Sequence, residues 1–519
     1  MPTPRLPDAL AIEALETLNR LGYKRAGEAL GLHPDTVVSR AQRAKQRITG
    51  ALGESIEREF KRPIEKTRLV ITSAQNATPV HAGFMAALKL FCKHNNAQLL
   101  VTPYRYKNPT SVFAKDDKAA DWWHADLVPY LCNERKRLNK NLTLLGDVKT
   151  QPTAEQPLSG FETMTHSESA ILGHPRLQSR TVPTPRSRMP KILTTTGSVT
   201  RKNYTDTKAG KKGDFHHTFG ATFVELRGSR FHLRQINADR DGSFIDLDKR
   251  YGCNGKVQKA PRALSIVMGD MHVDFADPQA VAATFGAGGM VEVLRPLSLV
   301  WHDVLDGYSR NPHHRDNVFN EIAKRSKGRH SVSAEVRRAI DFLDAHTPAG
   351  VQSVVVSSNH DDFLARWIKD TDWRRDPDNA MFYLDTARAM VGSTKLGDGG
   401  LEVCEPFAYW IESRLGRDRV RCLRRDESFE LAGIECGFHG DRGPSGARGS
   451  IKNMRAIGPK VVIGHSHAPG IEQGAYQVGT KSRLRLEYNS GPSGWLHTDC
   501  VIYANGKRCL LNIIDGEWR

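Results

Sequence analysis

Short apolar and β-branched runs alternate with amphipathic stretches through much of the chain. Residues 68–73 and 98–102 are β-branched and apolar, and residues 80–94 between them carry apolar positions at helical spacing. This order predicts a β-α-β unit, and hence an α/β fold. Residues 222–227 and 231–236 flank a Gly-Ser turn and predict a β-hairpin.

The first 60 residues have a different, purely helical pattern. Apolar residues in 10–18, a second helix at 23–30, a turn at 31–34 and a third helix at 35–47 resemble a helix-turn-helix. The third helix carries the basic side chains that would face DNA, namely Arg40, Arg43, Lys45 and Arg47. A helical hairpin used for contacts between subunits is the alternative, and the pattern leaves both open.

Residues 61–258 form the expected middle α/β domain. No glycine-rich loop follows its first strand, which argues against a dinucleotide site. Residues 176–190 and 200–212 are rich in Pro, Thr and basic residues and are expected to be long loops. They are either arms that contact the substrate or solvated connections.

Five apolar runs in the last half of the chain each lead into Asp, Asn or His. A buried strand is the expected structure for each run, and ligands gather beyond the carboxyl ends of strands in layered α/β folds. The runs and the side chains that follow them are 264–268 with Asp270 and His272, 297–301 with Asp303 and Asp306, 351–356 with Asn359, His360 and Asp361, 431–436 with His439, and 460–463 with His465 and His467.

The residue types at these strand ends are metal ligands. Carboxylate, imidazole and amide oxygen suit Mn²⁺, Fe²⁺, Zn²⁺ and similar ions. In the Asp-x-His and His-x-His pairs, side chains two apart on an extended segment point to the same side and can reach one ion or two neighbouring ions. Each pair alone has an ordinary structural explanation, but five in order predict a metal site.

The same residues resemble the calcineurin-like metallophosphoesterase superfamily. Its pattern of Asp-x-His, Gly-Asp-x-x-Asp, Gly-Asn-His-Asp/Glu, a lone His and Gly-His-x-His is matched in order from Asp270 to His467. His302 and Ser358 stand where the family has glycines, which leaves the tightness of those two turns in question.

The resemblance implies a role for each residue. Asp270, His272, Asp303 and His467 would hold a first metal, and Asp303, Asn359, His439 and His465 a second, with Asp303 bridging. His360 would act as the acid beside the leaving oxygen, and Asp361 or Asp306 would orient it. Two divalent ions are therefore the expected cofactors, with Mn²⁺ as the first choice and Mg²⁺, Fe²⁺ or Zn²⁺ as alternatives.

The fold implied for residues 259–519 is a four-layer αββα sandwich of two mixed sheets between helices. The helices expected there are 333–346, 380–391, 407–415 and 445–457, and residues 501–503 and 510–514 are the expected closing strands. The whole chain would then be a helix-turn-helix-like segment (1–60), an α/β accessory domain (61–258) and a metallophosphoesterase domain (259–519).

The amino-acid composition indicates what kind of binding partner to expect. The 519 residues include 75 Lys and Arg against 58 Asp and Glu, a formal net charge of +17, which favours a polyanion such as DNA. The eight cysteines form no CxxC pair, the N-terminus lacks a signal-peptide pattern, and no run is long enough for a membrane span. The cytoplasm is the expected location, which would be the host cytoplasm for a phage protein.

The expected activity is that of a two-metal phosphodiesterase on DNA, with a metal-bound hydroxide attacking the phosphodiester. The nuclease branch of the superfamily, either double-strand-break-repair-like or phage DNA-degrading, is the expected relative. Further candidate DNA contacts are Arg310, His313, His314 and Arg315. A phosphatase for protein or small-molecule esters and a DNA-binding protein with an inactive site remain as alternatives, and a homo-oligomer is one role left open for the middle region.

Overall fold

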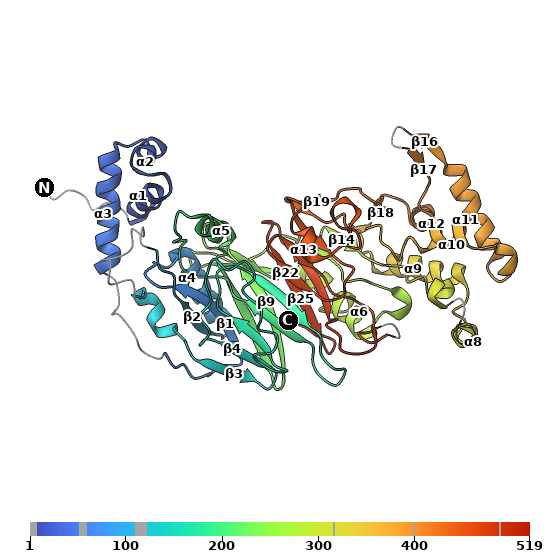
Figure 1. Cartoon of the computed structure of the whole chain (residues 1–519), viewed down its shortest axis with the longest axis horizontal. Helices are drawn as coiled ribbons and strands as arrows, with labels where there is room; N and C mark the ends of the chain where they lie inside the picture. The colour runs from blue at the N-terminus through green and yellow to red at the C-terminus, as the bar shows by residue number, and fades with distance from the viewer. Residues whose placement is uncertain (1–7, 51–59, 109–121, 315–316, 398–399, 487–488) are drawn as a thin grey trace.

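The computed structural model describes residues 8–50, 60–108, 122–314, 317–397, 400–486 and 489–519. It is a mixed α/β structure with several mixed sheets. The N-terminal helices lie at one end of an elongated molecule. The other end contains α8 (Val318–Ser326), α11 (Ala380–Ser393) and the hairpin of β16 (Lys395–Gly397) and β17 (Gly400–Glu402) (Figure 1). No helix among the described residues is long and apolar enough to cross a bilayer.

The N-terminal helices occur where the sequence pattern predicts them, as α1 (Asp8–Leu21), α2 (Tyr23–Leu30) and α3 (Pro34–Gly50). Gly27 allows the turn after α2 to close, because a Cβ at this position would lie 2.8 Å from the carbonyl oxygen of Leu32. Arg43 is exposed and Arg40 is half-buried, whereas the side chains of Lys45 and Arg47 lie outside the described residues.

The predicted β-α-β unit and hairpin form one four-stranded sheet in the order β2-β1-β8-β9. Strands β1 (Arg68–Gln75) and β2 (Gln98–Tyr104) are parallel and are joined through α4 (Ala82–His94). β8 (Gly220–Arg227) and β9 (Arg230–Asn237) form the hairpin. Phe84, Leu88 and Phe91 of α4 pack into the core on one side of this sheet.

A seven-stranded sheet holds the first three of the five expected strand ends. Its order is β18-β15-β14-β13-β24-β25-β26, and β13, β14, β15 and β18 run parallel. The strands are β13 (Ser265–Val267), β14 (Ser298–Trp301), β15 (Gln352–Val355), β18 (Val420–Cys422), β24 (His497–Ile502), β25 (Arg508–Ile514) and β26 (Glu517–Trp518).

A ten-stranded sheet combines strands from both sides of residue 258. Its order is β19-β20-β21-β23-β22-β6-β7-β5-β4-β3, with β22 antiparallel to β6. Its strands are β3 (Arg135–Asn139), β4 (Leu142–Leu145), β5 (Ser169–Leu172), β6 (Gln178–Val182), β7 (Lys191–Thr195), β19 (Glu430–Leu431), β20 (Ile434–Glu435), β21 (Lys460–Ile463), β22 (Gly470–Glu472) and β23 (Ala475–Gln477). The middle region therefore contributes strands to the same sheet as the C-terminal half.

The two large sheets share a buried apolar core. Side chains of β13, β14 and β15 meet side chains of β20, β21 and β22 in one cluster, which includes Val267, Val300, Val354, Ile434, Val462 and Ile471. The other face of the seven-stranded sheet is covered by helices α6 (Pro278–Phe285), α7 (Met290–Leu294), α9 (Val332–His346), α10 (Phe363–Asp370) and α12 (Pro406–Leu415). Helix α13 (Ile451–Met454) covers the outer face of β21 and β23.

Four expectations from the sequence were wrong in detail. Residues 176–190 contain strand β6 and residues 200–212 contain the start of α5 (Lys208–His216), so neither stretch is a continuous loop. The expected helix 445–457 is reduced to α13, because Gly446 has φ 77° and Gly449 packs against the carbonyl of Gly440. The expected strand 431–436 bends into a hairpin at Ala432 and Gly433, which have φ of 51° and 75°.

The remaining helices, strands and 3₁₀ turns lie outside the three sheets described above. They are the strands β10 (Phe244–Asp246), β11 (Lys249–Tyr251), β12 (Val257–Lys259), β16 (Lys395–Gly397) and β17 (Gly400–Glu402), the helices α8 (Val318–Ser326) and α11 (Ala380–Ser393), and the 3₁₀ turns η1 (Ala125–Tyr130), η2 (Val273–Phe275), η3 (Tyr308–Arg310), η4 (Pro312–His314), η5 (Trp373–Arg375) and η6 (Pro444–Gly446).

We expect residues 259–519 expressed alone not to fold stably. Without β6, strand β22 would become an open edge, and buried residues of β22 such as Ile471 would become accessible. Thermal unfolding followed by circular dichroism, with the full chain as control, tests this. A cooperative transition at the temperature of the full chain would contradict it.

A candidate metal centre

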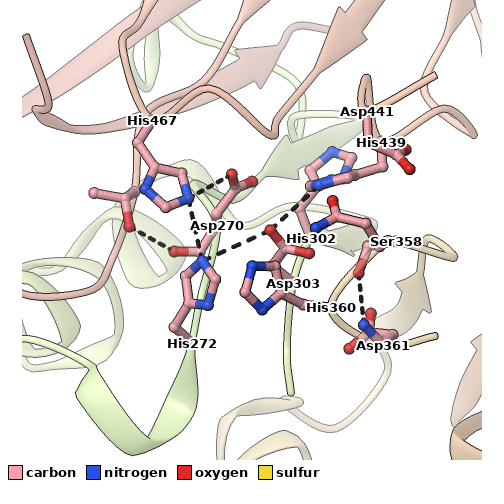
Figure 2. A network of polar contacts seen from close by, with 12 residues as sticks. Asp270, His272, His302, Asp303, Ser358, His360, Asp361, His439, Asp441 and His467 are labelled. Atoms are coloured by element: carbon pink, nitrogen blue, oxygen red, sulfur yellow. Dashed lines mark hydrogen bonds and ion pairs between the residues drawn. The ribbon is translucent and has the colours of Figure 1, made fainter. Parts of the chain in front are cut away.

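The five strand ends converge, as expected from the sequence. Asp270 and His272 follow β13, Asp303 follows β14, and Asn359 and His360 follow β15, whereas His439 follows β20 and His465 and His467 follow β21. The carboxyl ends of the parallel strands meet at one edge of each sheet, so side chains from two sheets enter the same place (Figure 2).

Four of these residues form a buried cluster. One nitrogen or carboxylate oxygen from each of Asp270, His272, Asp303 and His467 lies within 4.8 Å of the others. His467 Nε2 is 3.1 Å from Asp270 Oδ2, and His272 Nε2 is 3.1 Å from His467 Nε2 and 3.6 Å from Asp303 Oδ2. This is the set that the family resemblance assigned to the first metal, and it could hold a metal ion.

Asp303 also contacts His439, one of the residues assigned to the second metal. His439 Nε2 lies 3.2 Å from Asp303 Oδ2, and the ring of His465 lies 5.3 Å from that of His439 between centroids. The buried Oδ1 of Asn359 has no hydrogen-bond partner among the described residues. A buried, unpaired amide oxygen is costly, and binding a cation would offset that cost.

The backbone is strained where the cluster forms. His272, Asp303, His465 and His467 have φ of 41°, 44°, 74° and 57°, in the left-handed region that non-glycine residues rarely adopt. Such conformations gather at functional sites, where the surrounding structure enforces them. Gly464 is needed beside them, since a Cβ there would lie 2.2 Å from Asp270 Oδ1.

The electrostatics of the cluster favour bound positive charge. Burial alone would lower the pKa of His272, but the carboxylates of Asp306, Asp303 and Asp270 outweigh it and raise that pKa to about 9. Burial likewise opposes protonation of His439, yet Asp303 and Asp270 raise its pKa to about 9. Carboxylates that hold protons on imidazoles this strongly would also attract a divalent cation, which must displace those protons.

His360 is oriented by a backbone carbonyl. Its Nδ1 is 2.8 Å from the carbonyl oxygen of Asp306, an acceptor, so Nδ1 carries the proton and Nε2 faces away from this contact. The Asp306 carboxylate instead lies 2.9 Å from His272 Nδ1, and Asp361 Oδ1 accepts the N–H of Leu305 at 2.9 Å. Both carboxylates therefore hold neighbouring parts of the site, and His360 is oriented by the main-chain carbonyl of Asp306.

The two residues that replace the family glycines fit their turns. Ser358 Oγ accepts the N–H of Asp361 at 3.0 Å. His302 is buried, and its Nδ1 lies 3.3 Å from Nδ1 of His439. Burial and the neighbouring His439 lower the pKa of His302 to about 4, so it is neutral and can accept the Nδ1 proton of His439. That contact would leave His439 Nε2 free to bind a cation.

The sequence pattern did not predict two groups of residues that support the metal centre. Asp499 Oδ1 accepts the N–H of Gly269 at 2.9 Å, and Asp499 Oδ2 binds the buried Lys481 Nζ at 2.5 Å, so this pair holds the turn before Asp270. Glu335 accepts the N–H groups of Tyr308 and Ser309 at 2.8 and 3.0 Å and so holds the chain after Asp306.

A weak signal for Glu335 was present in the sequence. It falls on the buried face of α9 with Val332 and Val336, where a charged residue needs a partner. Burial and Asp274 raise its pKa to about 7. Nothing local marked Lys481 or Asp499, because their partners lie elsewhere in the chain.

The candidate DNA contacts near the site have varied surroundings. Arg310 makes a two-pronged ion pair with Asp376, at 2.7 Å for both nitrogens, and lies near Glu321. The ring of His314 is 5.5 Å from that of Tyr308. Arg315 and the side chain of His313 lie outside the described residues.

The fold and site define a mixed α/β protein with a buried Asp–His cluster that could hold a metal ion. No family model matches the chain. The chain is 32% identical to Protein A1 of Escherichia phage T5 over 465 residues, which cover 87% of this chain and 82% of that protein. It therefore belongs to the family of this phage protein.

We expect His302→Ala to weaken metal binding by about 10- to 100-fold, because His439 would lose the partner that sets its tautomer. Isothermal titration with Mn²⁺ measures the affinity. His302→Asn, whose amide oxygen can accept the same proton, should restore most of it. Equal affinities in both variants and the unmodified chain, with unchanged melting temperature, would refute this role.

Proposed function

We propose that this protein is a two-metal phosphodiesterase that acts on DNA. The observation that carries the proposal is the buried cluster of Asp270, His272, Asp303 and His467, contributed by three strand ends of two sheets. Carboxylate and imidazole ligands gathered in this way are typical of sites that activate water for phosphoester hydrolysis.

The arrangement of layers supports placing residues 259–519 among the calcineurin-like metallophosphoesterases. Two mixed sheets pack face to face, with five helices on the outer face of the seven-stranded sheet and the short helix α13 over β21 and β23 of the ten-stranded sheet. An αββα sandwich is the fold that the motif resemblance implies. The order of the ligands along the chain supports the same assignment.

In the proposed reaction, each group at the site has a distinct task. Asp270, His272, Asp303 and His467 would hold one ion, and Asp303, Asn359, His439 and His465 the other. Bound divalent ions, with Mn²⁺ as first choice, supply Lewis acidity and an activated water. His360, with Nδ1 tied to the Asp306 carbonyl, can present a proton on Nε2 to the departing oxygen.

Charge and family support DNA as the substrate. The net charge of +17 favours a polyanion, and the α2-turn-α3 unit has the order of a helix-turn-helix with Arg43 exposed. Membership of a phage protein family supports a phage nuclease that works in the host cytoplasm. Arg40, Arg43, Lys45 and Arg47 remain the proposed groove contacts.

A homo-oligomer is also proposed. Exposed apolar side chains concentrate on α8, α11 and the hairpin β16–β17, where Phe319 is 79% exposed and Leu396 is 86% exposed. Surfaces of this kind usually mark contacts with another protein chain.

We expect the purified protein to nick supercoiled plasmid DNA with Mn²⁺ and to lose this activity in EDTA. Gel electrophoresis of the plasmid, beside hydrolysis of p-nitrophenyl phosphate, measures both candidate activities. Monoester hydrolysis without nicking would favour a phosphatase instead. Retention of DNA without metal-stimulated cleavage of either substrate would indicate an inactive DNA-binding protein.

We expect Asp303→Ala and His360→Ala to lose activity for different reasons. Asp303 contacts both His272 and His439, so its loss should abolish both metal binding and cleavage. His360→Ala should keep the metal but slow turnover by about 100-fold or more, the usual loss for a proton-transfer residue. Metal content by elemental analysis and plasmid cleavage rates separate the two, and full activity in Asp303→Ala would overturn the proposal.

A further inference from the structure

A cavity of about 280 Å³ adjoins the candidate metal centre on the side of His467. Ser466, which lines it, stands between the proposed ligands His465 and His467. Trp495, which also lines it, packs against His467 with ring centroids 4.1 Å apart and planes at 70°. A ligand in this cavity would therefore lie next to a phosphodiester at the metal centre.

The middle region closes one wall of the cavity. Thr181 and Pro183, at the end of β6, line it opposite the segment that carries Trp495. Thr184 and Ser493 exchange two backbone hydrogen bonds of 3.0 Å, which join the two walls. Gly494 keeps them close, since a Cβ there would lie 3.0 Å from Thr181 Oγ1.

The walls have the chemistry of a nucleobase site. Trp495 is half-buried and offers an aromatic ring, and the hydroxyl-bearing residues Ser466, Ser490 and Ser493 also line the cavity. The volume lies just below the usual range for small-ligand pockets, roughly 300–1,000 Å³, and suits one nucleoside better than a larger ligand. Aromatic rings beside hydroxyl groups are the usual means of holding an unpaired base.

The chain on either side of the cavity is basic. Arg186 and Arg188 follow Pro183 and are exposed, and Arg483 is exposed before the Trp495 segment. Arg485 donates from its guanidinium to the carbonyl oxygens of Thr184 and Gly491 and so joins the two walls of the cavity. Exposed guanidinium groups beside a cavity suit the phosphates of a strand that enters it.

We propose that this cavity binds the base of an unpaired nucleotide next to the scissile phosphate, with Trp495 as the aromatic contact. The inference rests on the proposed function, since it takes the metal centre as the place of phosphodiester cleavage. A base within a duplex has both faces covered, so the cleaved nucleotide must be unpaired, as at a strand end, in a single strand or where a supercoiled duplex opens locally.

The cavity serves the nucleoside that stays on the phosphate. His360, which would protonate the leaving oxygen, packs its ring 4.6 Å from that of His272, whereas His467 is the ligand residue that contacts Trp495 of the cavity. We therefore assign the leaving group to the side of His360 and the nucleoside that stays on the phosphate to the cavity beside His467.

Two chromogenic diesters test the proposal. Thymidine carrying a p-nitrophenyl phosphate on its 5′ or 3′ oxygen contains a base, whereas methyl p-nitrophenyl phosphate does not, and both release p-nitrophenolate. The ratio of their kcat/KM values measures the contribution of the base. Trp495→Ala should lower this ratio about 5- to 100-fold, the usual effect of removing a base-stacking ring.

Matched variants distinguish the loss of base stacking from a general loss of structure or activity. Trp495→Phe keeps a ring and should retain most of the ratio. Trp373→Ala removes a partly exposed tryptophan of η5, which does not line the cavity, and should leave the ratio unchanged. A ratio in Trp495→Ala equal to that of the unmodified protein, with both esters hydrolysed, would overturn the base site and leave the proposed function intact.

A binding measurement covers the remaining case. If the unmodified protein hydrolyses neither diester, cleavage of plasmid DNA still decides the proposed function. Fluorescence anisotropy of labelled oligothymidine with the protein in EDTA then tests the base site without catalysis. Affinity weakened about 5-fold or more in Trp495→Ala but not in Trp373→Ala supports the site, and equal affinities overturn it.

Discussion

Mutual repulsion among buried carboxylates is the constraint on which the rest of this structure depends. Asp270, Asp303 and Asp306 are at most 7% exposed and converge on one place. Buried charges must be paired, and here imidazoles supply the pairing, as the raised pKa values of His272 and His439 indicate. A divalent cation bound by these carboxylates and imidazoles would take the place of the protons on the imidazoles.

The left-handed backbone conformations of the ligand residues, and the side chains that hold the adjacent turns, are consequences of that convergence. Bringing His465 and His467 to Asp270 requires backbone conformations that cost about 1–3 kcal/mol each, which the surrounding sheets must offset. The buried pair of Lys481 and Asp499 and the contacts of Glu335 hold the turns on which Asp270 and Asp306 stand. The site is therefore supported by residues far from it in sequence.

The middle region contributes structure to the site, and its sequence alone did not predict this contribution. Strand β6 completes the ten-stranded sheet beside β22, and its end forms a wall of the cavity next to His467. The region expected to be a loop with basic residues is in fact a strand followed by an exposed arginine-bearing turn. This position gives the proposed base site two walls from segments about 300 residues apart, as in the pairing of Thr184 with Ser493.

The sequence by itself determined the strands that end in Asp, Asn and His, because buried β-branched runs and their exits are local patterns, and the order of the ligands came with them. The α/β character of residues 68–104 and the three N-terminal helices were readable for the same reason. Helix 445–457 was overpredicted, since the contact of Gly449 with Gly440 that breaks it is tertiary. The tertiary structure alone decided that β6 pairs with β22, that His302 faces His439 and that Trp495 stands beside His467, because each of these contacts joins residues more than about 25 positions apart whose meeting no local periodicity encodes.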